Sequence, residues 1–277
     1  MTNVTIGQYY PENSIIHRLD PRVKLFGTLV FIVLLFITNN LFGYIMLSLF
    51  VLGVIIASKV PFSRMLKGLK GILVIIILSV IINLFTTPGE TVLTFKSLKI
   101  TKEGLEISGY LVWRLVLMVV GTTVMTLTTS PTDIADGMEK SLRVLNLIKI
   151  PVHEISMIMS LALRFIPTLM EEMNKITKAQ KARGVNLETG NIFKRVKSLI
   201  PILIPLFISS IRRAMELAYA MEARCYHGGK RTKMKPLKYK KADAVGYLVC
   251  FALIALMVCA NIAVLRIDSM SRFISSI

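Results

Sequence analysis

Long apolar runs, divided by short polar segments, occupy both ends of the chain. The first runs from Leu25 to Ala57, 33 residues that are almost uncharged, with Asn39-Asn40 near its middle. A helix of that length would extend about 50 Å, well beyond the about 30 Å of bilayer hydrocarbon. We therefore predict two membrane spans here and three more in the later apolar runs. The expected spans are residues 22–38, 41–58, 68–85, 109–129 and one within 243–277.

The stretch 130–242 follows a different pattern, in which apolar residues recur at helical spacing on otherwise charged segments. Ile158, Phe165 and Met173 belong to a stripe whose mean step is 3.6 residues, which indicates an amphipathic helix. Ser130-Pro131 is typical of a helix start. We predict helices at 131–147, 152–183 and 193–225.

Together these patterns predict an all-α polytopic membrane protein with about five transmembrane helices. A cytoplasmic coupling domain of one short and two long amphipathic helices is inserted between the fourth and fifth spans. The expected divisions are a membrane domain at 1–129, the coupling helices with a basic tract at 130–242, and a last transmembrane helix with its tail at 243–277.

Composition and charge agree with a membrane location and suggest an orientation. The chain is 54% hydrophobic and 18% charged, against about 45–50% and about 25% in soluble domains. Its net charge is +18, and 21 of the 34 basic residues lie in 130–242. Basic residues precede the first span and follow the second, so the positive-inside rule predicts a cytoplasmic N-terminus and a cytoplasmic 130–242 block in the cell membrane.

Motifs for catalysis or nucleotide binding are missing from the sequence. It contains no G-x-x-x-x-G-K-[ST] loop and no cysteine pattern of a metal site, so we predict neither an enzyme nor a bound metal or cofactor. A self-contained secondary transporter or channel is the alternative function, although such proteins usually need ionisable groups inside the membrane. The basic tract Lys230–Lys241 suggests contact with lipid headgroups rather than nucleic acid.

The two long helices are predicted to end in the same pattern, Ala-x-x-Ala-Arg followed by a small residue. The copies begin at Ala179 and Ala220, 41 residues apart. Alanines at i and i+3 leave a smooth helix face, and arginine adds a rigid fork of five donors. The residues alone leave two interpretations open, because alanine and arginine are also ordinary residues of a last helical turn.

Four motifs, taken in order, resemble one known family. They are Ser14-Ile15-Ile16-His17-Arg18-Leu19-Asp20-Pro21-Arg22-Val23-Lys24, Leu163-Arg164-Phe165-Ile166-Pro167, Ala182-Arg183-Gly184 and Ala223-Arg224-Cys225-Tyr226. The chain resembles the transmembrane T component (EcfT/CbiQ-like family) of energy-coupling factor (ECF) transporters. This resemblance implies a vitamin uptake system in which the T component couples two ABC-type ATPases to a small substrate-binding S component.

The resemblance also implies which residues meet these partners. One ATPase would receive Ala182, Arg183 and Gly184, and the other Ala223, Arg224 and Cys225, which departs from the motif's glycine. Ala179 and Ala220 would support the two helix ends. The platform for the S component would include Ile158, Leu161, Phe165, Pro167, Leu203 and Phe207.

Overall fold

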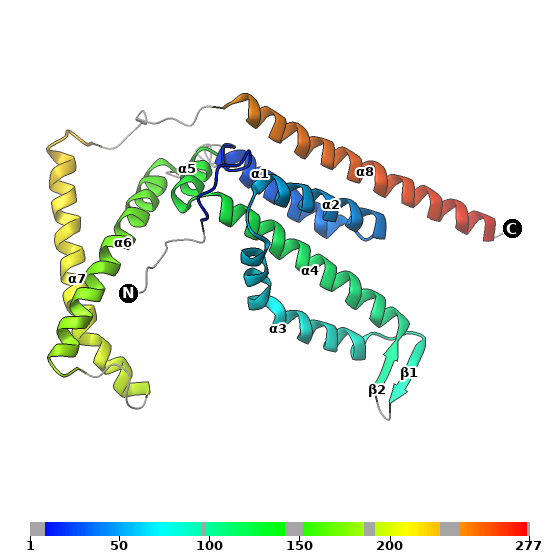
Figure 1. Cartoon of the computed structure of the whole chain (residues 1–277), viewed down its shortest axis with the longest axis horizontal. Helices are drawn as coiled ribbons and strands as arrows, with labels where there is room; N and C mark the ends of the chain where they lie inside the picture. The colour runs from blue at the N-terminus through cyan, green and yellow to red at the C-terminus, as the bar shows by residue number, and fades with distance from the viewer. Residues whose placement is uncertain (1–8, 96–97, 142–151, 186–191, 228–238, 276–277) are drawn as a thin grey trace. The chain divides into compact units, whose positions relative to one another are not determined.

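The computed structural model describes residues 9–95, 98–141, 152–185, 192–227 and 239–275. The chain forms two compact units, one of residues 7–141 with 237–277 and the other including 142–236. The helices that dominate both units confirm the predicted all-α class (Figure 1). The first unit contains α1 (Pro21–Ile37), α2 (Leu41–Ser58), α3 (Phe62–Thr86), α4 (Lys102–Thr128), α5 (Pro131–Ser141) and α8 (Lys241–Ser275), and the second α6 (Val152–Ala182) and α7 (Ile192–Glu222).

Local signals explain where several helices of the first unit begin and end. The Asp20 carboxylate accepts a hydrogen bond from the Arg22 amide, and Pro21 occupies the first turn of α1. The Thr101 hydroxyl accepts from the Gly104 amide at the start of α4. Helix α3 starts six residues before the predicted 68, and α4 seven before the predicted 109, so basic residues expected in loops lie in first helical turns.

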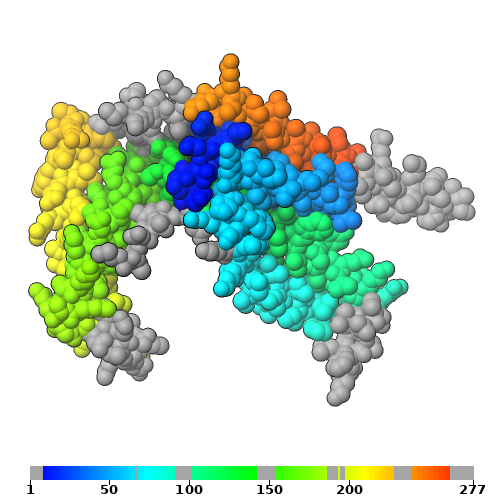
Figure 2. All heavy atoms as spheres, viewed as in Figure 1, coloured from blue at the N-terminus to red at the C-terminus, as the bar shows by residue number. Residues whose placement is uncertain are grey.

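Helix α1 lies at the centre of the first unit and packs against α2, α4, α5 and α8. In Figure 2 the atoms of α8, in orange, lie along those of α1 and α2, in blue. The core includes Phe31 and Leu35 of α1, Tyr44 and Leu47 of α2, and Met257 of α8, all almost completely buried. Helix α5 belongs with these helices, whereas the sequence grouped it with the coupling helices.

A short antiparallel hairpin joins α3 to α4. Strand β1 (Thr91–Phe95) pairs with β2 (Leu98–Thr101), and Phe95 lies opposite Leu98 across the turn. The Lys102 amide donates to the Glu90 carbonyl, which joins the hairpin's base to the start of α4. The sequence analysis did not predict these strands, because at four and five residues they are too short to stand out beside the apolar runs.

Among the residues that the structure describes, five helices are long and apolar enough to cross a membrane. Four of them coincide with predicted spans. Helix α1 has 17 residues, about 25 Å, and is shorter than the others. The fifth is Lys197–Glu222 of α7, which the sequence placed among the coupling helices because its last turns are charged. Length and composition alone select this helix, and the chain is a multi-pass membrane protein in which four of the predicted spans coincide with such helices.

The second unit is a crossed pair of long helices. Helices α6 and α7 cross one another and run in opposite directions, so their C-terminal ends lie at opposite ends of the pair (Figure 1). Pro167 lies inside α6, and Pro201 and Pro205 lie inside α7. The two helices end one and three residues before the predicted 183 and 225, and predicted helical positions 142–147 lie outside the described residues.

Candidate docking site at two helix ends

The end of α6 is closed by a backbone motif centred on Gly184. This glycine has a left-handed φ of 88°. The Gly184 amide donates to the Lys181 carbonyl at 3.0 Å, and the Val185 amide donates to the Gln180 carbonyl at 3.0 Å. These two bonds define a Schellman motif, in which a left-handed residue turns the chain back over the last helical turn. Arg183 therefore occupies the cap position of α6.

The end of α7 has the same motif, and each of its residues lies 41 positions after its counterpart in α6. Cys225 has a left-handed φ of 56° and donates its amide to the Glu222 carbonyl at 2.8 Å. The Tyr226 amide donates to the Met221 carbonyl at 3.0 Å. Cysteine therefore adopts the conformation that glycine provides in the first copy, at a cost of about 1–2 kcal/mol for a residue with a Cβ. The departure from glycine does not change the fold of this helix end.

All eight residues expected at the two ends are exposed. Within the described part of the chain, neither the Arg183 nor the Arg224 guanidinium donates a hydrogen bond to protein. An arginine held at a helix cap without an internal partner keeps its five donors for another molecule. The exposed residues are Ala179, Ala182, Arg183, Gly184, Ala220, Ala223, Arg224 and Cys225.

A polar cluster fixes the crossing of the two helices. The Glu172 carboxylate of α6 accepts from the Arg213 guanidinium of α7 at 2.9 Å. Its other oxygen accepts from the Ser209 hydroxyl. Sequence analysis missed this cluster, although a signal was present: Glu172 and Arg213 are separated by the same 41 residues as Arg183 and Arg224.

The crossing point is equidistant in sequence from the two ends. Arg183 follows Glu172 by 11 residues, and Arg224 follows Arg213 by 11. Each end therefore lies about 16 Å along its helix from the crossing. Tyr226, next to the second end, donates its hydroxyl to the Met157 sulfur near the start of α6 at 3.2 Å. This contact holds the second end beside the start of α6, and the first end lies at the opposite end of that helix.

The expected platform residues divide between two places. Leu203 and Phe207 of α7 line one apolar hollow of about 470 Å³ together with Ile204, Leu206 and Ser210. Leu203 is 57% exposed and Phe207 67%. The other four lie on α6 and do not line this hollow among the described residues: Ile158 and Pro167 are exposed, and Leu161 and Phe165 are half-buried.

The N-terminal motif forms a hydrogen-bonded network rather than an exposed site. The His17 ring contacts the Ser14 hydroxyl at 2.7 Å and the Tyr10 carbonyl at 2.9 Å. Burial is the largest of several effects on this imidazole and lowers its pKa below the usual 6.5. The Asp20 amide donates to the buried Asp243 carboxylate at the start of α8, a partner the sequence did not indicate.

These features define a class of protein: a helical multi-pass membrane protein that presents two helix ends with the same cap motif. The family model of CbiQ, described as a cobalt transport protein, matches residues 12–236. The chain therefore belongs to this CbiQ/EcfT family of transmembrane transporter components.

Several relatives share nearly their full length with the chain. It is 48% identical over 263 residues to the energy-coupling factor transporter transmembrane protein EcfT of Clostridium kluyveri, which covers 94% of this chain and 97% of that protein. The Bacillus subtilis protein of the same name is 44% identical over 259 residues, covering 93% and 98%. The protein of that name from Lactococcus lactis is 45% identical over 247 residues, covering 88% and 93%. These names agree with the prediction that the chain is a transporter component and not an enzyme.

Proposed function

We propose that this chain is the coupling subunit of an ATP-driven micronutrient importer. Two ABC-type ATPase subunits bind its two helix ends, and a small membrane S component that carries a vitamin or similar cargo binds the apolar surface of α6 and α7. The observation that supports this most strongly is the repetition of one cap: two Schellman motifs, 41 residues apart, each with an exposed arginine at the same position.

The chemistry of the helix ends suits insertion into a groove. At the first end, Ala179 and Ala182 leave a smooth exposed surface, and the left-handed Gly184 directs the chain away behind Arg183. A groove wall can then approach the helix closely. The guanidinium would meet carboxylates or the free carbonyls at the end of a partner helix, both of which accept its planar fork of donors.

The spacing of the ends supports two separate receptors. Each end lies about 16 Å along its own helix from the Glu172–Arg213 crossing, in opposite directions. Two equivalent ends on a nearly symmetric helix pair match two similar ATPase subunits. Movement of either ATPase would then change the angle between α6 and α7, which is how coupling would reach the apolar platform.

The apolar platform supports an S component as the third partner. The hollow at Leu203 and Phe207 lies on α7, and large exposed apolar surface of this kind marks protein or membrane contacts. We place the N-terminus and 130–242 in the cytoplasm, where ATP is available, because the basic residues gather there.

Charge reversal at both ends tests the proposal. In cells that express the ATPases and an S component, the double variant R183E/R224E should abolish uptake and release the ATPases from purified complexes. The matched control K175E/R212E makes the same change in charge at exposed positions of α6 and α7 away from the ends and should keep both properties. Normal uptake by R183E/R224E would refute the proposal.

A flux assay separates the alternative function. The purified chain alone, in liposomes with an ion gradient, should move no cargo if it is a coupling subunit. Gradient-driven flux without ATPases would instead identify a secondary transporter or channel.

A further inference from the structure

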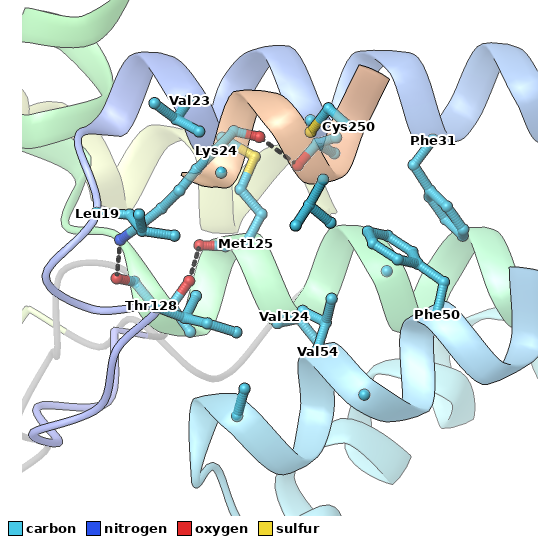
Figure 3. Close-up of a pocket in the computed structure, with 18 of the residues that line it drawn as sticks. Leu19, Val23, Lys24, Phe31, Phe50, Val54, Val124, Met125, Thr128 and Cys250 are labelled. Atoms are coloured by element: carbon cyan, nitrogen blue, oxygen red, sulfur yellow. Dashed lines mark hydrogen bonds between the residues drawn. The ribbon is translucent and has the colours of Figure 1, made fainter. Parts of the chain in front are cut away.

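An apolar cavity of about 470 Å³ lies among α1, α2, α4 and α8 (Figure 3). Each of these helices contributes a glycine to its lining, but at Gly27, Gly121 and Gly246 a Cβ would meet a neighbouring side chain within 3.2 Å. At Gly53 nothing lies within 4 Å of where a Cβ would be, and that space belongs to the cavity. The four glycines are Gly27, Gly53, Gly121 and Gly246.

The cavity has the depth of one bilayer leaflet. One end lies where α1 begins, α2 and α4 end, and α8 begins, near Lys24, Ala57 and Thr128. The other end reaches Phe31 and Phe50, whose rings lie 6.3 Å apart. Phe31 lies ten residues from the start of α1 and Phe50 eight from the end of α2, about 15 and 12 Å along the axes. Half of the about 30 Å hydrocarbon layer is a similar distance.

Lys24 is the one charged residue that lines the cavity among the described residues. Its ammonium donates to the Thr128 carbonyl at 2.9 Å (Figure 3). It also donates to the His17 carbonyl at 3.4 Å. No carboxylate of the described residues lies within ion-pair distance of it. The nearby Asp20 and Asp243 carboxylates accept backbone amides, and the nearby Asp133 carboxylate accepts from the Ser130 hydroxyl. None of the three is paired with the ammonium, which can therefore bind a further anion.

The cavity is open to the surroundings between α2 and α8. At its edge Leu49 is 60% exposed and Val245 is 61% exposed. Both helices are long and apolar enough to cross a membrane, so the medium at this opening is lipid. A chain molecule can therefore enter sideways from the bilayer.

We propose that this cavity binds one acyl chain of an anionic phospholipid, with the headgroup phosphate at Lys24. The apolar walls, the depth of one leaflet, the opening toward lipid and a single cation at the headgroup level all match that amphiphile. A second protein chain would need a longer surface than this short cavity offers. The inference is independent of the proposed partners of α6 and α7.

Two substitutions separate the acyl-chain and headgroup contacts. Gly53→Leu adds a side chain to the cavity lining at a position where a Cβ meets nothing within 4 Å, and Gly71→Leu is its matched control in α3, where a Cβ also meets nothing within 4 Å but lines no part of the cavity. Lys24→Gln removes the cation, and Arg18→Gln removes an exposed charge outside the lining as its control.

Native mass spectrometry of the full-length chain, released from detergent after adding phosphatidylglycerol or phosphatidylcholine with identical acyl chains, provides the test. We expect wild type, Gly71→Leu and Arg18→Gln to retain one phosphatidylglycerol in preference to phosphatidylcholine. Gly53→Leu should lose this lipid, and Lys24→Gln should lose about fivefold in the preference for the anionic lipid. Equal retention by Gly53→Leu and Gly71→Leu, or no headgroup preference in wild type, would overturn the proposal.

Discussion

The Glu172 carboxylate and the Arg213 guanidinium, 2.9 Å apart, join α6 and α7 at equivalent points of a repeated pattern. Each residue precedes its helix-end arginine by 11 positions. The ion pair thus joins the two helices at a point that is the same number of residues from each helix-end arginine. Any change in the crossing angle must therefore move both helix ends about this pair.

Reversing either charge of this pair should reduce uptake while both ATPases remain bound. Glu172→Arg places two cations at the crossing, and Arg213→Glu places two carboxylates there. The swapped double variant E172R/R213E restores an opposite pair and should recover much of the lost activity. Side chains that are 32% and 24% exposed predict a coupling energy of about 1 kcal/mol. Uptake assays combined with ATPase co-purification measure both effects, and additive losses in the double variant would contradict the positioning role.

Exchanges at the two left-handed residues should act in opposite directions. Gly184→Ala adds a Cβ at a φ of 88° and should weaken the first end by about 1 kcal/mol. Cys225→Gly removes a Cβ at a φ of 56° and should strengthen the second end by a similar amount.

Hydrogen exchange at the Val185 and Tyr226 amides measures this, because each donates the longer-range bond of its motif. Faster exchange at Val185 in the first variant and slower exchange at Tyr226 in the second are expected. Changes of the same sign in both variants would contradict the shared cap geometry.

Helices were predictable where one signal dominated the sequence. The apolar run with Asn39-Asn40 at its middle predicted α2 with the bounds it has in the structure. The apolar spacing that begins at Ile158 predicted a helix where α6 lies, and the predicted start at 152 is also the observed one. The sequence analysis missed the initial turns of α3 and α4 because their charged residues interrupt the apolar runs. In the structure the two helices pack against each other.

Part of the candidate site was predictable from the sequence and part was not. The two arginine motifs are contiguous in sequence and could be found there. The Glu172–Ser209–Arg213 cluster and the Tyr226–Met157 contact join residues of different helices, so their partners depend on how α6 and α7 cross. Arg114 of α4 depends on tertiary packing in the same way, because its guanidinium donates to the Tyr44 hydroxyl of α2 at 2.9 Å.

Acidification should loosen the N-terminal segment through His17. Burial lowers the pKa of this imidazole in the folded protein below its usual 6.5, so folding favours the neutral ring. Its contribution to stability is complete above the unfolded pKa, about 6.5, and is lost as the pH falls through that value toward the folded pKa. Thermal unfolding between pH 7.5 and 5 should show a decrease that is smaller in His17→Gln. Identical pH profiles for the two proteins would assign the decrease to other groups.

Removing the Asp243 carboxylate should separate the starts of α1 and α8. This buried side chain accepts from the Asp20 amide at 2.7 Å and from the Lys240 amide at 2.6 Å. Asp243→Ala leaves a buried amide without its acceptor and should cost about 2–3 kcal/mol, whereas Asp243→Asn keeps one acceptor oxygen and should cost less. Thermal unfolding of both variants in the same detergent measures the difference. Equal losses in the two variants would contradict the prediction, because the oxygen that asparagine keeps would then add nothing to stability.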